Sequence, residues 1–154
     1  MNVTSLAPWY YAWACSMPII VVNVVIHIAG LAAIHSKVAP ILSASAAYGR
    51  LTARFTAAMS VVVAALTGLH AVEGAVWASS YRIVGAVSNI RIAMLYSIEA
   101  MTSYGHAPVY PQPHWQMMGA LEALNGMILF GLTTAFLFAF LWFTPLFFRH
   151  ARTE

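Results

Sequence analysis

The chain has 154 residues, of which 62% are hydrophobic and only 7% are charged, and its formal net charge is +3. A soluble domain usually carries roughly 25% charged residues, so this composition excludes a protein whose whole surface faces water. Seven Lys and Arg residues are too few for a nucleic-acid-binding surface, and we expect membrane lipids, not nucleic acid, as the surroundings of this chain.

Three long apolar segments predict membrane-spanning helices over residues 17–34, 55–80 and 115–148. Each is long enough to cross roughly 30 Å of hydrocarbon at a rise of about 1.5 Å per residue. The third would be about 50 Å long as a straight helix, so we expect it to tilt or to protrude. The sequence therefore predicts an all-α membrane protein with three transmembrane helices.

A fourth segment, residues 88–102, is moderately apolar and helical in character but too short to cross a bilayer. The turn-rich residues 103–114 follow it, with Gly105 and three prolines. Irregular backbone at membrane depth persists only where it lines a cavity or is packed in protein. The pattern favours a re-entrant pore helix and loop, and an ordinary helical loop outside the membrane is the alternative that spacing leaves open.

The positions of the basic residues predict the orientation of the chain. Five of them lie on one side of the predicted spans and two on the other. The five are Lys37, Arg50, Arg54, Arg149 and Arg152, and the two are Arg82 and Arg91. By the positive-inside rule the majority side is cytoplasmic. We therefore expect a plasma (inner) membrane protein, bacterial in type, with its N-terminus outside and its C-terminus in the cytoplasm. Tyr81, Tyr110 and Trp115 are then expected as an aromatic belt at the outer face.

Two residue runs, in this order and sidedness, resemble those of potassium-channel pore domains. Residues 93–103, AMLYSIEAMTS, resemble the pore-helix signature, and residues 130–135, FGLTTA, resemble an inner-helix stretch. The chain also resembles small bacterial ion-channel proteins that have an extra N-terminal span. The resemblance implies a homotetramer, with an extra helix and linker over residues 1–54, a pore domain over residues 55–148 and a cytoplasmic tail over residues 149–154.

The stretch that aligns with the selectivity filter departs from the family pattern Thr-Thr-Val-Gly-Tyr-Gly-Asp. This chain has TSYGHAP over residues 102–108, so the second glycine becomes Ala107 and the acid becomes Pro108. A filter of this family is built from rings of backbone carbonyls. Glycine accepts the left-handed backbone that such a loop needs, whereas alanine there costs roughly 1–2 kcal/mol. We expect family-like geometry near Ser103–Gly105 and a different outer part, which leaves the choice between K⁺ and Na⁺ open.

The resemblance also implies roles for individual residues. The implied ion-conducting filter is Thr102, Ser103, Tyr104, Gly105, His106 and Ala107. Glu99 and Ser97 would support it, with His106 or a loop amide as the partner of Glu99 in place of the lost acid. Further implied roles are a gating hinge at Gly126 and Gly131, cavity-lining hydroxyls at Thr133 and Thr134, and a polar network of His70, Glu73 and Glu122.

Two histidines suggest other chemistry. A ring of four His106 imidazoles would make conduction depend on pH near 6.5, whereas a single hydrogen bond behind the loop is the simpler interpretation. His27, one turn after Asn23, could be a haem or metal ligand with His70 as its partner. Counting from the ends of the predicted spans places these two side chains roughly 12 Å apart in depth. A core histidine bonded to a neighbouring helix is therefore the expectation for His27.

The leading hypothesis is a tetrameric channel for monovalent cations, with K⁺ as the first expectation and no cofactor or metal beyond the permeant ion. A structural or accessory subunit that does not conduct is one alternative, and a His-ligated membrane redox protein is another. The chain has no Asp, no paired cysteines and no phosphate-binding glycine loop, so we do not expect an enzyme.

Overall fold

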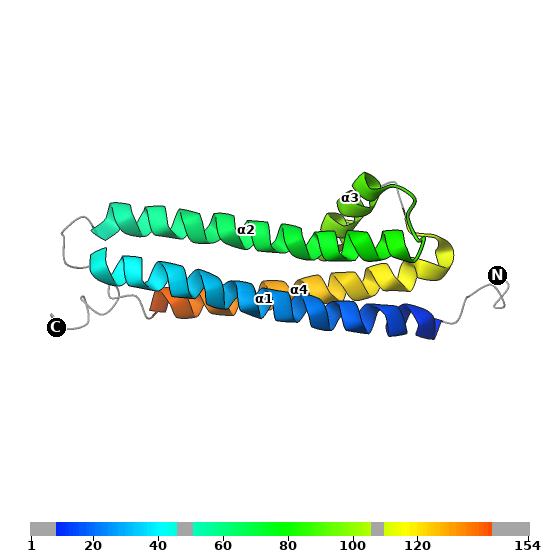
Figure 1. Ribbon diagram of the computed structural model, residues 1–154, viewed down its shortest axis with the longest axis horizontal. Helices are drawn as coiled ribbons and strands as arrows, with labels where there is room; N and C mark the ends of the chain where they lie inside the picture. The colour runs from blue at the N-terminus through cyan, green and yellow to red at the C-terminus, as the bar shows by residue number, and fades with distance from the viewer. Residues whose placement is uncertain (1–8, 46–50, 106–109, 143–154) are drawn as a thin grey trace. The chain divides into compact units, whose positions relative to one another are not determined.

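The computed structural model describes residues 9–45, 51–105 and 110–142, and the regular elements within these residues are all helices (Figure 1). They are α1 (Trp9–Ser45), α2 (Leu51–Ile83), α3 (Ile90–Met101), the short 3-10 helix η2 (Pro113–Trp115) and α4 (Gln116–Trp142). Three segments are long and apolar enough to cross a membrane, namely Trp9–Ile41, Ala53–Ile83 and Pro113–Trp142. This confirms the predicted all-α, multi-pass membrane protein.

The long helices extend beyond the predicted spans. Helix α1 begins at Trp9 instead of residue 17 and ends at Ser45 instead of residue 34, and α2 begins at Leu51 instead of residue 55. An apolar window marks only the roughly 20 residues that match the hydrocarbon core. Backbone hydrogen bonding does not depend on that match, so it continues through the aromatic and small residues on either side.

Helix α3 follows a tight connection after α2. Gly85 has a φ of +72°, a conformation that glycine adopts without steric cost. Asn89 then caps the helix, because the backbone N–H of Arg91 donates to its side-chain oxygen at 2.8 Å. The helix begins at Ile90, close to the predicted start at residue 88.

The chain divides into two compact units, and each draws on all three long helices. Unit 1 comprises Met1–His27 and His70–Phe130, and unit 2 comprises Ile28–Leu69 and Gly131–Glu154. Helix α3 belongs to unit 1. Neither unit coincides with the N-terminal helix alone or with the predicted pore domain alone, and the predicted boundary after residue 54 stays a prediction.

The two units have different cores. In unit 1, Trp77, Tyr81, Met118 and Leu129 are fully buried and pack together. In unit 2 the core is apolar and consists of Val38, Val62, Leu66 and Phe140. Unit 2 also contains a close approach of α1 to α2, because a Cβ added to Gly30 would lie 2.7 Å from both methyl groups of Leu69.

Candidate functional site

A buried carboxylate on α4 links three helices of unit 1. Glu122 accepts a hydrogen bond from the hydroxyl of Tyr81 at 2.7 Å and another from the hydroxyl of Ser97. The Ser97 hydroxyl also lies 2.9 Å from the backbone carbonyl of Gly74. All three side chains are fully buried. Ser97 was predicted to support the filter, and it attaches α3 to α2 and α4 at a single point.

Three glycines of α2 and α4 let α3 lie close to these helices. A Cβ on Gly74 would lie 3.1 Å from the terminal carbon of Ile98. A Cβ on Gly119 would collide with the hydroxyl of Tyr96, and one on Gly126 would collide with the backbone carbonyl of Met101. Gly126 therefore allows the last turn of α3 to contact α4.

The contacts of Gly126 and Gly131 differ, although both were predicted as gating hinges. Gly126 faces the end of α3, whereas a Cβ on Gly131 would meet nothing within 4 Å. Both residues lie inside the continuous helix α4. Their hinge role stays a prediction.

Helix α3 ends in a Schellman motif that shapes the start of the predicted filter. The N–H of Tyr104 donates to the carbonyl of Glu99 at 2.9 Å, and the N–H of Ser103 donates to that of Ala100 at 3.0 Å. Ser103 takes the left-handed position of this motif with a φ of +56°, and Gly105 follows with a φ of +66°. These loop residues and Thr102 are exposed. His106 and Ala107, the rest of the predicted filter, lie outside the described residues.

A cavity of about 190 Å³ lies beside this loop in unit 1. Glu99, Ser103 and Gly105 line one side of it, and Gly119 and Ala123 of α4 line another. The Oε2 atom of Glu99 is buried and accepts no hydrogen bond from the described residues. The predicted partner of Glu99, His106, is not among those residues.

Tyr96 also lines the cavity. Burial, followed by the nearby carboxylate of Glu122 and the phenol of Tyr110, raises the pKa of Tyr96 to about 12. The phenol is therefore neutral throughout the physiological pH range.

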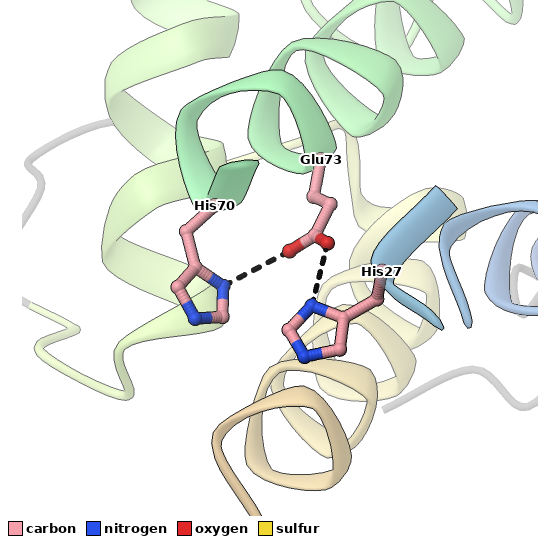
Figure 2. A group of neighbouring side chains, drawn as sticks. All are labelled: His27, His70 and Glu73. Carbon is pink, nitrogen blue, oxygen red and sulfur yellow. Dashed lines mark hydrogen bonds and ion pairs between the residues drawn. The ribbon is translucent and has the colours of Figure 1, made fainter. Parts of the chain in front are cut away.

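A second buried carboxylate, Glu73, contacts two imidazoles in unit 1 (Figure 2). The Nδ1 atom of His27 is 2.8 Å from Glu73 Oε1, in hydrogen-bonding geometry. The Nδ1 atom of His70 is 2.9 Å from Glu73 Oε2, which is an ion-pair distance, although the angles are not those of a hydrogen bond. The side-chain amide of Asn23 donates to the backbone carbonyl of Glu73 at 3.4 Å. Glu73 and Glu122 were predicted to belong to one polar network. In the structure Glu73 contacts His27 and His70, whereas Glu122 contacts Tyr81 and Ser97.

The predicted offset in depth between His27 and His70 was wrong. Their ring centroids are 5.4 Å apart. His27 precedes Ser45, the end of α1, by 18 residues, and His70 follows Leu51, the start of α2, by 19 residues. The two side chains are therefore level, and the error came from counting from the ends of apolar windows instead of from the helix ends.

Other predicted residues lie apart from these clusters, and some relevant residues were missed. Thr133 is buried and Thr134 is exposed on α4 in unit 2, and their cavity-lining role stays a prediction. Tyr81 was predicted in an aromatic belt but is fully buried, because its hydroxyl has a carboxylate partner. Asn125 is also fully buried, with no hydrogen-bond partner for its side chain among the described residues. Its spacing of three residues from Glu122 on a helix was the signal that could have found it.

No family model matches the chain, and no curated protein or solved structure is detectably similar to it. The resemblance to potassium-channel pore domains therefore rests on the residue runs 93–103 and 130–135 alone. Any function of this chain is a proposal from its own residues and contacts.

Proposed function

We propose that this chain is one subunit of a homotetrameric cation channel, with α3 as its pore helix and residues 102–105 as the inner part of its filter. The observation that carries the proposal is the position at which α3 ends. The backbone of Met101 lies against Gly126. Gly126 follows Gln116, the first residue of α4, by ten residues, which is about 15 Å along the helix axis.

The contact of α3 with α2 places the end of α3 at a similar distance from the end of a spanning helix. Gly74 faces Ile98 and Met101 and precedes Ile83, the last residue of α2, by nine residues, or about 14 Å. The candidate spans on α2 and α4 have 31 and 30 residues, or about 45 Å, and thus exceed a hydrocarbon core of roughly 30 Å by about 15 Å. With the core centred on these spans, α3 ends about 7 Å inside it, which supports re-entry into the bilayer. Non-helical backbone at that depth needs protein or a water-filled cavity around it, and a pore supplies both.

The backbone of the loop is compatible with a carbonyl-lined filter. Ser103 and Gly105 have positive φ angles, and Tyr104 between them does not. Alternation of right- and left-handed residues turns successive carbonyls toward one side of a chain, and here it begins in the turn that ends α3, where Ser103 and Tyr104 still donate to helix carbonyls. This is the arrangement that a stack of carbonyl rings requires, and the rings need one loop from each of several subunits.

The exposed apolar surface of this region is consistent with assembly. Leu95 of α3 is 53% exposed and Tyr104 of the loop is 65% exposed in the single chain. In a tetramer the neighbouring subunits would cover these side chains. The position of α3 and its loop would then agree with entry from the outer face, as the distribution of basic residues suggests.

Cation flux into liposomes tests the proposal. The purified protein is reconstituted with K⁺ or Na⁺ inside, and flux is followed with an ion-sensitive dye. We expect flux above that of protein-free liposomes, and a marked loss of it in Gly105→Ala. A left-handed alanine costs roughly 1–2 kcal/mol, and the tetramer has four copies.

Gly68→Ala is the matched control, because Gly68 lies on α2 and an added Cβ there would meet nothing within 4 Å. Its flux should equal that of the parent. Absence of flux for every ion and pH tested, from a protein that is helical and tetrameric in detergent, would contradict the proposal and favour a non-conducting structural subunit.

A further inference from the structure

The imidazole and carboxylate groups of His27, His70 and Glu73 converge in the middle of two spanning helices. Each residue offers one ligand atom, and these three atoms all lie within 4.8 Å of one another. His27 and Glu73 are completely buried, and the side chain of His70 is 18% exposed. Figure 2 shows both rings turned with one nitrogen toward the carboxylate. The three groups thus form a small polar site surrounded by apolar segments.

An ionised Glu73 would need a balancing cation. An ionised carboxylate inside a membrane protein is costly unless it is paired. Within the described residues, the only ion-pair contacts of Glu73 are those with the two imidazoles. Arg82, a basic residue on the same helix, instead donates to the backbone carbonyls of Val87 and Ser88. A cation bound beside the three groups would supply this pairing.

The donor set and its geometry point to a site for a divalent transition-metal ion of the Zn²⁺ class. Two imidazole nitrogens and one carboxylate oxygen suit this class, whereas K⁺-like, Mg²⁺ and Ca²⁺ sites use oxygen ligands. Three protein ligands also match the zinc centres that keep a fourth position for water or another ligand. The ions that this site would hold thus differ chemically from those that the proposed filter would conduct.

The observed distances fit such an ion after a modest rearrangement. In a tetrahedral centre with bonds of about 2.0–2.1 Å, neighbouring ligand atoms are about 3.3 Å apart. The two Nδ1 atoms contact different oxygens of Glu73, Oε1 at 2.8 Å and Oε2 at 2.9 Å, and the three candidate ligand atoms lie within 4.8 Å of one another, so the side chains would have to shift for both nitrogens and one oxygen to surround a single ion. In addition, Glu73 Oε2 is fully buried, and its contact with His70 Nδ1 at 2.9 Å lacks the geometry of a hydrogen bond, so this oxygen could turn toward an ion.

A metal ion here would clamp α1 to α2 within unit 1. His27 comes from α1, and both other ligands come from α2. The i, i+3 spacing of His70 and Glu73 presents both from one face of that helix. The site does not depend on the proposed channel function, because it involves no residue of α3 or of the filter loop.

Metal titration of the purified protein tests this inference. The full-length protein, purified without a histidine tag and stripped with a chelator, is titrated with Co²⁺ and then with Zn²⁺. We expect one Co²⁺ per chain with visible ligand-field absorption typical of a four-coordinate site, and its displacement by Zn²⁺. X-ray absorption of the Zn²⁺-loaded protein should show two imidazoles and an oxygen at about 2.0–2.1 Å.

The variants His27→Gln and Glu73→Gln keep the size and polarity of the side chains while weakening ligation. We expect affinity to fall roughly 100-fold or more, since even loss of a group that orients a ligand weakens metal binding about 10- to 100-fold. His35→Gln is the matched control, because His35 is an exposed histidine of the same helix. Its affinity should be unchanged.

Two results would overturn the inference. One is the absence of saturable Co²⁺ binding to the parent protein, which would mean that the three groups form a polar cluster without a metal ion. The other is Zn²⁺ absorption without imidazole ligands, or binding lost in His35→Gln and retained in Glu73→Gln. The absorption measurement uses the parent protein, so it decides the matter even if a variant fails to fold.

Discussion

Unit 1 and unit 2 are both built from segments of α1, α2 and α4, yet their interiors differ chemically. Among the described residues, every buried polar or charged side chain except Thr133 belongs to unit 1. The core of unit 2 is aliphatic and aromatic. Helices in lipid gain little from hiding apolar groups, so their association depends on close packing and hydrogen bonds. Unit 1 has both close packing at glycines and buried hydrogen bonds. Its buried polar groups make it the better candidate for a functional site.

The largest expected effect comes from introducing the same residue into both interiors. Glu122→Met in unit 1 would leave the buried hydroxyl of Tyr81 without an acceptor, whereas the Ser97 hydroxyl would keep the backbone carbonyl of Gly74. An unsatisfied buried donor costs about 1–3 kcal/mol, and we expect a loss of about 3 kcal/mol. Leu66→Met in unit 2 conserves volume and should cost less than about 1.5 kcal/mol.

Unfolding of both variants in detergent micelles, followed by circular dichroism, measures this difference. Glu122→Gln serves as the control, because it keeps one acceptor oxygen and should lose less than Glu122→Met. Equal losses in Glu122→Met and Leu66→Met would remove the distinction between a polar and an apolar unit.

The next comparison uses two glycines of the same helix. Gly126→Ala in unit 1 places a methyl group against the backbone carbonyl of Met101, which cannot rotate away, and overpacking typically costs about 1–3 kcal/mol. Gly131→Ala in unit 2 meets nothing within 4 Å and should gain up to about 1 kcal/mol from helix propensity. Thermal unfolding of the two variants side by side tests this. Similar stability of the two would indicate that α3 does not hold its place against Gly126.

Features that depend on residues close together in the sequence could be predicted, and contacts between residues far apart in the sequence could not. The three spanning helices follow from local hydropathy, and the pairing of His70 with Glu73 follows from their spacing on one helix. The contact of His27 with Glu73 spans 46 residues of sequence and depends on the register between two helices. The prediction placed His27 and His70 at different depths because it counted from the ends of apolar segments, which do not coincide with the ends of the helices.

The site around α3 was predictable in outline only. The residue run 93–103 indicated a short helix before a loop, and α3 occupies most of it. Its partners could not be predicted, because Tyr81 and Glu122 are 41 residues apart and meet only after packing. The left-handed Ser103 also left no trace in the sequence, since that position of a helix end is usually glycine.

A smaller effect is expected where α3 meets α2. Gly74→Ala in unit 1 would bring a methyl group within 3.1 Å of the terminal carbon of Ile98, which is the end of a flexible side chain. Gly68→Ala, in unit 2 on the same helix, meets nothing. Rotation of Ile98 limits the cost, so we expect Gly74→Ala to be about 1 kcal/mol less stable than Gly68→Ala. Urea or detergent unfolding of both variants measures the difference, and a more stable Gly74→Ala would mean that α3 has room to move.

The smallest effect is expected at Ser103, where unit 1 tolerates a left-handed residue with a side chain. Ser103→Gly removes a steric cost of roughly 1–2 kcal/mol but adds backbone entropy to the unfolded chain, worth about 0.4–1 kcal/mol. We expect a net gain of up to about 1 kcal/mol in the free energy of unfolding. Ser36→Gly is the control, because Ser36 lies inside α1 in unit 2, where replacing serine by glycine should cost about 0.5 kcal/mol. A loss of stability in Ser103→Gly equal to that in Ser36→Gly would show that the Schellman turn does not persist, and with it the loop geometry that supports a filter.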